Sequence, residues 1–164
     1  MGPKKKMRSL YIHQLFKSPK EGGGIRSYYL AKAAADAGHE VNMLTTHNLK
    51  SGLEEIDGIQ VHYIRIPYDN SFGFLKRLWA YGQFVLKARG LARKLPKADL
   101  AYVMTTPLTT GWIATWIKRE LAVPYYFEVG DLWPDVPVEM GVIKNSFLKN
   151  WLFKKEKQFY RGGN

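Results

Sequence analysis

Two short segments combine residue types that suit the binding and transfer of a charged group. The first holds three consecutive glycines, Gly22, Gly23 and Gly24, and Arg26 follows them. Glycines between a strand and a helix let the backbone approach a ligand closely, and the free N–H groups at a helix start attract anions. This pattern indicates either a phosphate-binding loop or a tight turn without a ligand.

The second segment is the run of residues 128–135, which reads EVGDLWPD. Asp131 follows the end of an expected strand, where a carboxylate can accept a hydrogen bond from a substrate hydroxyl or act as a base. Its alternative role is to cap the next helix. Trp133 is either a core residue or a flat platform for a sugar or another ring. The segment is therefore a second candidate for binding or catalysis.

Several common enzyme classes lack their motifs in this sequence. The glycine loop has Ser27 where the dinucleotide fingerprint has its third glycine, and no acidic residue follows the second expected strand. No Gly-Lys-Ser/Thr and no Gly-x-Ser-x-Gly is present, and the chain has no cysteine. The four histidines show no metal-ligand spacing. We therefore expect neither a nicotinamide or flavin cofactor nor a metal.

The elements that would position these segments alternate between strand and helix. With 164 residues, 46% of them hydrophobic, the chain can form one folded domain. A polar loop containing Gly52 and Gly58 is expected before the third strand, and Pro134 and Pro137 are expected to break the chain before the last helix. The strands are expected at 7–16, 41–45, 59–66, 99–105 and 124–129, and the helices at 25–37, 73–95, 107–121 and 146–160.

This alternation predicts an α/β fold with a Rossmann-like parallel sheet and helices on both faces. In such sheets ligands bind at the carboxyl ends of the strands. The rule selects residues 17–26, 104–109 and 129–135. It should therefore bring the triple glycine, Thr106 and Asp131 to one edge of the sheet.

The charge of the chain is strongly positive, with 25 Lys and Arg against 14 Asp and Glu, a net +11. The excess of basic residues is clustered. No acidic residue lies between Asp69 and Asp99, and Glu156 is the only acidic residue in 144–161. Such clustering indicates an anionic partner, which is a nucleic acid, a phosphorylated ligand or an anionic lipid surface. A generic solvated basic surface is the alternative.

The expected helix 73–95 has a wider apolar arc than packing on a sheet requires. The surplus apolar surface suggests a second apolar partner for this helix. The basic residues beside it favour an anionic membrane surface in this role, and further packing inside the domain is the alternative. The membrane-contact candidates on this helix are Lys76, Arg77, Trp79 and Lys87.

The ordered combination of EGGGIRS (21–27), LAKA (30–33), AGHEV (37–41) and EVGDLWP (128–134) resembles the N-terminal half of a GT-B glycosyltransferase. The resemblance is to the retaining family 4 group, and the last segment is similar to that of bacterial cell-surface polysaccharide members. It implies a basic tail over 1–7 and an acceptor-side domain over 8–161. The donor-binding domain is then absent, and this half alone is expected to be inactive.

The resemblance also implies substrates, partners and a location. The donor would be a nucleotide-sugar and the acceptor a glycan, often lipid-linked, with no metal and no nucleic acid involved. The protein would be cytoplasmic and peripheral at the inner face of the cell membrane. The alternative function is a non-catalytic phosphate- or nucleic-acid-binding α/β module.

The resemblance assigns roles to individual residues of this sequence. Asp131 is the candidate catalytic residue, as a polar contact to the transferred sugar or a base. The candidates for binding substrate and phosphate are Gly22, Gly23, Gly24, Arg26, Thr106 and Trp133.

Overall fold

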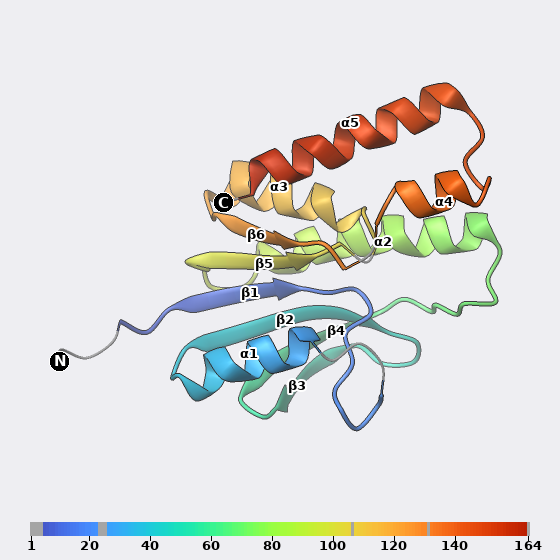
Figure 1. Ribbon diagram of the computed structural model, residues 1–164. Coiled ribbons are helices and arrows are strands. Elements are labelled where there is room, and N and C mark those ends of the chain that lie inside the picture. Colours follow the sequence, from blue (N-terminus) through green and yellow to red (C-terminus); the bar gives the residue numbers. More distant parts are fainter. Residues whose placement is uncertain (1–4, 23–25, 106, 131, 164) are drawn as a thin grey trace.

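The computed structural model describes residues 5–22, 26–105, 107–130 and 132–163 as an α/β fold around a six-stranded sheet (Figure 1). The elements, in chain order, are β1 (Arg8–Ile12), α1 (Arg26–Asp36), β2 (Glu40–His47), β3 (Gly52–Ile56), β4 (Ile59–Arg65), α2 (Phe74–Ala92), β5 (Leu100–Met104), α3 (Thr110–Leu121), β6 (Tyr125–Glu128), α4 (Asp135–Glu139) and α5 (Ser146–Gly162).

The strand order is β3-β4-β2-β1-β5-β6, and β1 pairs in parallel with both β2 and β5. The chain runs from β1 outward through β2 and β4, then crosses back to β5 and β6 on the other side of β1. Strand order therefore reverses between β1 and β5. In open α/β sheets, this reversal leaves a crevice beyond the carboxyl ends of the two strands.

Helices cover both faces of the sheet, with α1 on one side and α2, α3 and α5 on the other (Figure 1). Successive side chains of a strand point to opposite faces. Tyr11 thus packs in the cluster that contains Tyr28 of α1, whereas Ile12 packs in the cluster that contains Phe84 of α2. The predicted Rossmann-like α/β architecture is confirmed.

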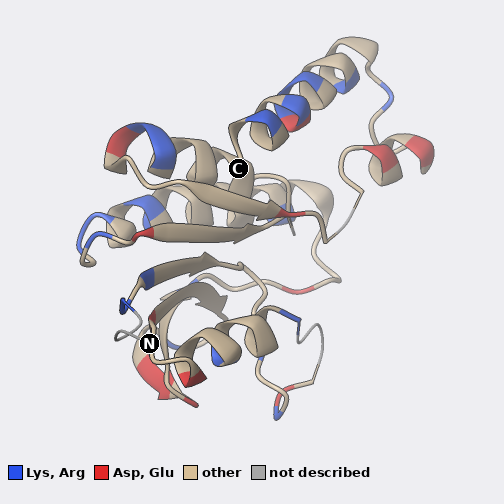
Figure 2. Ribbon diagram, turned by 60° about the vertical axis from the view of Figure 1, so that its left-hand side comes forward, with Lys and Arg blue, Asp and Glu red and all other residues tan. Residues whose placement is uncertain are grey.

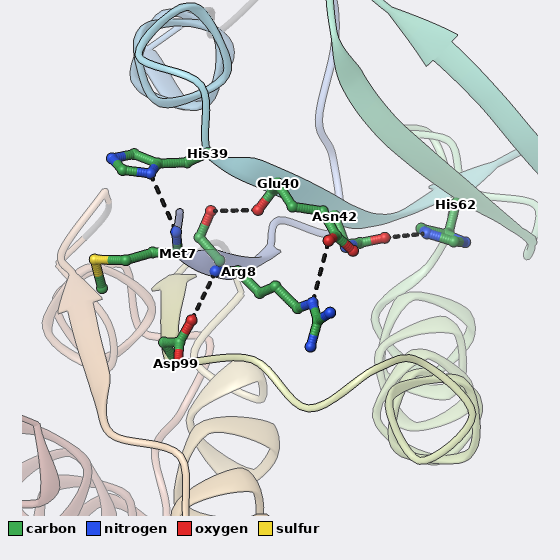
Figure 3. Close-up of polar contacts among 8 residues, drawn as sticks. Met7, Arg8, His39, Glu40, Asn42, His62 and Asp99 are labelled. Carbon is green, nitrogen blue, oxygen red and sulfur yellow. Dashed lines mark hydrogen bonds and ion pairs between the residues drawn. The ribbon is translucent and has the colours of Figure 1, made fainter. Parts of the chain in front are cut away.

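Polar contacts fix the start of β1 at the amino-terminal edge of the sheet (Figure 3). The backbone N–H of Arg8 donates to the Asp99 carboxylate at 2.8 Å, and Arg8 Nε lies 3.1 Å from Glu40 Oε2. The backbone N–H of Met7 donates to Nδ1 of His39 at 3.3 Å. These contacts give the amino-terminal edge a structural role.

The expected polar loop before the third strand contains the strand β3, which pairs antiparallel with β4. A two-residue turn, Asp57-Gly58, joins the two strands with φ values of 49° and 81°. Asp-Gly is typical of such hairpin turns. The prediction missed β3 because this edge strand is exposed from Gly52 to Glu55 and lacks a buried apolar alternation. The sheet is therefore mixed at one edge.

Further differences from the predictions concern the end of β1 and the segment between β6 and α5. β1 ends at Ile12 instead of Phe16, because the chain turns there and the N–H of Phe16 donates to the carbonyl of His13. The short helix α4 begins directly after Pro134 and contains Pro137, although both prolines were expected only to break the chain. Pro137 is tolerated because it lies in the first turn, where backbone N–H groups have no helical partner.

Two helical glycines offer a matched test of the packing between α3 and α5. A Cβ at Gly111 would overlap the ring of buried Phe159, whereas a Cβ at Gly82 of α2 would meet open space. Gly111→Ala is expected to lower the free energy of unfolding by about 1–3 kcal/mol. Gly82→Ala is expected to raise it by about 0.5–1 kcal/mol. Urea unfolding of both variants checks this, and equal effects would contradict the packing.

Candidate functional site

The loops that follow β5 and β6 are joined at the carboxyl edge of the sheet. The backbone N–H of Thr105 donates to the carbonyl of Glu128 at 2.9 Å, and the N–H of Gly130 donates to Thr105 Oγ1 at 2.9 Å. The predicted site residues Thr106 and Asp131 are the sequence neighbours of this pair. Both lie outside the described residues, as do Gly23 and Gly24.

Glu128, the last residue of β6, is the centre of a polar cluster at this edge. Its side chain is 11% exposed and lies 2.5 Å from Nη1 of Arg26, the first residue of α1. It also accepts a hydrogen bond from the Tyr102 hydroxyl. Strand register explains the second contact, because Tyr102 pairs with Tyr126 and is therefore a diagonal neighbour of Glu128 on the same face. Burial and this carboxylate raise the pKa of Tyr102.

His13 and Ser27 form a second pair beside the cluster. Both are buried, and His13 Nδ1 lies 2.7 Å from Ser27 Oγ. Burial lowers the pKa of His13 to about 4, although the charge of Glu128 acts in the opposite direction. The imidazole is therefore neutral near pH 7, and it links the end of β1 to the first turn of α1.

The arrangement can hold an anion and a hydroxyl side by side. The Arg26 guanidinium is largely exposed and contacts Glu128 through Nη1, so that other N–H groups face solvent and suit a phosphate. The Glu128 carboxylate can accept further hydrogen bonds from hydroxyl groups. Within the described chain, no group of three His, Asp or Glu side chains is placed to hold a metal.

Hydrogen bonds between Ser18 and Glu21 stabilise the turn that leads into the glycine loop. The Glu21 carboxylate accepts hydrogen bonds from the backbone N–H of Ser18 at 2.9 Å and from its hydroxyl at 2.8 Å. Gly22 has a φ of +68° and is exposed, with no atom within 4 Å of a Cβ placed there. The positive φ explains the need for glycine at this position, and the open surroundings leave room for a ligand.

Trp133 lines a different feature from the polar cluster. It borders an apolar pocket of about 550 Å³ together with Trp112 of α3 and Trp151 of α5. Trp133 is half-buried there. Whether Trp133 acts as a core residue or as a platform for a sugar or another ring stays a prediction.

The helix α2 buries one stripe and exposes an apolar stripe on its opposite side. Ala80, Phe84 and Ala88 are buried, whereas Leu75 is 78% exposed and Trp79 and Leu86 are each 70% exposed. The apolar surplus predicted for this helix is thus not used inside the described domain. No described helix is long and apolar enough to cross a membrane.

The other predicted membrane-contact residues, Lys76, Arg77 and Lys87, also belong to α2. Lys76 is exposed, with its Nζ 3.5 Å from the centroid of the Phe72 ring, and Lys87 Nζ donates to the carbonyl of Arg65 at 3.3 Å. Arg77 instead lines the apolar pocket.

The sequence prediction did not assign Glu128, Tyr102, His13 or Ser27 to the site. The register of β1 and β5 pairs Tyr102 with Tyr11, and these two rings lie 5.1 Å apart, but no local sequence pattern determines this register. A charged residue at the end of a buried strand was an available signal.

The chain belongs to the glycosyl transferase 4-like domain family, whose model matches residues 21–162. This match begins at the glycine loop and ends at the last residue of α5, so it includes Arg26, Tyr102 and Glu128. Membership supports glycosyl transfer as the general activity of proteins that contain this domain. No curated protein sequence matches the chain significantly.

Solved structures with similar folds agree with the architecture. Sucrose-phosphate synthase from Thermosynechococcus elongatus has a TM-score of 0.64 at 15% identity, covering 94% of this chain and 40% of that protein. Two structures of the C-terminal domain of a hydrogenase from Pyrococcus furiosus have TM-scores of 0.56 and 0.57 at 20% identity, each covering 77% of this chain and 95% of that domain. At these identities the likeness concerns the fold alone.

The low pKa of His13 leads to an expected pH dependence of stability. In the unfolded chain His13 takes up a proton below its ordinary pKa of 6.5, whereas in the folded chain it does so only near 4. Stability is therefore lost as the pH falls through this window, by roughly 2–3 kcal/mol in total. His13→Asn, which does not titrate, should lack this loss in urea unfolding at pH 6.5 and pH 4. The same pH dependence in both proteins would contradict the burial of a neutral His13.

Proposed function

We propose that the chain is the acceptor-side domain of a retaining glycosyltransferase. The enzyme would transfer a sugar from a nucleotide-sugar to a lipid-linked glycan acceptor in cell-surface polysaccharide synthesis. It would act in the cytoplasm at the inner face of the membrane, with a donor-binding domain opposite the carboxyl edge. The observation that supports this proposal best is the cluster of Arg26, Glu128 and Tyr102 beside the glycine loop.

The reaction needs groups that stabilise the negative charge on the leaving diphosphate. In this proposal Arg26 and the backbone N–H groups of Gly22, Gly23 and Gly24 contact that diphosphate. Glu128 keeps Arg26 oriented, because the ion pair fixes one side of the guanidinium while the other side remains open to solvent. Asp131 would contact the transferred sugar, and Thr106 would line the same crevice.

The exposed surface of α2 supports the membrane part of the proposal. An apolar stripe of Leu75, Trp79 and Leu86 next to Lys76 and Lys87 has the composition of a helix that lies in the interface of an anionic membrane. Tryptophan is favoured at this depth because its ring is apolar and its N–H polar. Such a contact would hold the enzyme where a lipid-linked acceptor is found.

Two ion-paired arginines at opposite edges of the sheet allow a matched test of the site. Arg26→Gln removes the charge that contacts the diphosphate, so the kcat/KM for glycosyl transfer should fall roughly 10- to 100-fold. Arg8→Gln breaks a comparable ion pair, with Glu40, at the amino-terminal edge and should leave kcat/KM near its original value. The assay uses the complete product of the gene with a nucleotide-sugar and a membrane-extracted acceptor.

Equal losses in the Arg26 and Arg8 variants would indicate a general effect on folding and contradict the assignment. Gly23→Val and Asp131→Ala test the rest of the crevice in the same assay. Near-normal turnover in both of these variants would count against the proposed site.

Membrane binding is tested with two exposed aromatic residues on opposite faces of the sheet, Trp79 of α2 and Tyr29 of α1. Binding of the chain to vesicles should increase with the fraction of phosphatidylglycerol and decrease with salt, because basic residues contribute electrostatically. Trp79→Ala should weaken sedimentation with vesicles, and Tyr29→Ala should not.

Equal binding to phosphatidylcholine vesicles, or no binding, would contradict the membrane contact. A salt-dependent mobility shift with duplex DNA, without vesicle binding, would favour the alternative of a nucleic-acid-binding module.

A further inference from the structure

An apolar pocket of about 550 Å³ lies between the starts of α2 and α3 and the helices α4 and α5. Pockets of roughly 300–1,000 Å³ hold drug-sized molecules. The pocket is open, because rim residues such as Met140 and Val142 are 74% and 54% exposed.

The lining is mostly apolar, and its polar residues include Arg77, Tyr81 and Thr109. Arg77 is the charged residue among those that line the pocket, and within the described chain no carboxylate lies at ion-pair distance from it. Thr109 also lines the pocket, but its hydroxyl oxygen has almost no exposed surface and no hydrogen-bond partner among the described residues. A ligand that pairs with Arg77 has an apolar body and an anionic, hydrogen-bond-accepting end.

The surroundings of the pocket also favour an anionic ligand. Figure 2 shows Lys and Arg along α5, the helix that contributes Trp151 to the lining. The helix α4 carries two acidic residues, Asp135 and Glu139, and neither of them lines the pocket.

The pocket and the polar cluster share the same two loops. The loop after β5 begins at Thr105, which contacts the loop of Glu128, and continues to Pro107, Leu108 and Thr109 in the pocket lining. The loop after β6 leads from Glu128 to Trp133, which also lines the pocket. The pocket is therefore connected through these loops to the carboxyl edge where glycosyl transfer is proposed.

From these observations we infer that the pocket binds the phosphate-proximal part of the hydrocarbon chain of a phosphate-linked lipid acceptor, with Arg77 at its phosphate. This inference rests on the proposed function and deepens it, because it assigns the lipid part of the acceptor to a defined site. In this arrangement the exposed stripe of α2 contacts the membrane surface, and the pocket binds one hydrocarbon chain that extends from the membrane.

Farnesyl phosphate is a soluble probe, and farnesol and inorganic phosphate are its two separate parts. Trp112, Trp133 and Trp151 line the pocket, whereas Trp79 and Trp116 do not. In ¹H–¹⁵N spectra of the chain, saturable shifts are expected for the indole signals of the three lining residues. Farnesyl phosphate should bind more tightly than farnesol, and phosphate alone should cause no saturable shift.

Two leucines provide the matched variants, because both are about half exposed. Leu78→Gln puts an amide into the lining and should weaken farnesyl phosphate binding roughly tenfold or more. Leu53→Gln, on the edge strand β3, should leave the affinity unchanged. Arg77→Gln should weaken binding of farnesyl phosphate but not of farnesol.

Absence of shifts at the three lining indoles, or equal effects of Leu78→Gln and Leu53→Gln, would overturn the inference. So would loss of binding in the complete gene product, because another part of that protein would then cover the pocket. Equal affinity for farnesol and farnesyl phosphate would overturn the role of Arg77. Glycosyl transfer that continues without farnesyl phosphate binding would refute this inference alone and leave the proposed function standing.

Discussion

The parallel pairing of β1 with β2 on one side and β5 on the other is the constraint on which the rest of the structure depends. Because the chain leaves β1 in one direction and returns to β5 in the other, the connecting helices lie on opposite faces of the sheet. The carboxyl ends of β1 and β5 therefore open into a crevice without a helix between them. The amino-terminal ends are fixed instead by direct contacts, such as that of Arg8 with Asp99.

The two faces of the same sheet edge carry different chemistry. On the face of α1, Arg26, Tyr102 and Glu128 make a charged cluster with an exposed guanidinium. On the face of α2 and α3, Trp112 and Trp133 border an apolar pocket. An acceptor with an apolar chain and a polar head matches this division, and a purely polar ligand would leave the pocket unused.

The sequence predicted the fold class, because buried strands, glycine loops and prolines are local signals, and it selected the carboxyl edge of the sheet for the candidate site. It did not predict β3, although Asp57-Gly58 is a hairpin signal, since an exposed edge strand needs no apolar alternation. The contact of Tyr102 with Glu128 depends on the register of β5 and β6, which no local pattern determines. The pocket depends on the placement of α4 and α5, which is a property of tertiary packing.

The central claim is that the donor's diphosphate meets this chain at the carboxyl edge beside Arg26 and Glu128. Hydrogen–deuterium exchange of the complete gene product, with and without a nucleotide-sugar, tests it most directly. We expect added protection in the peptides that contain Arg26 and Glu128 and none in those that contain Arg8 and Asp99 at the opposite edge. Protection confined to the opposite edge, or no change in the peptides of Arg26 and Glu128, would contradict the claim.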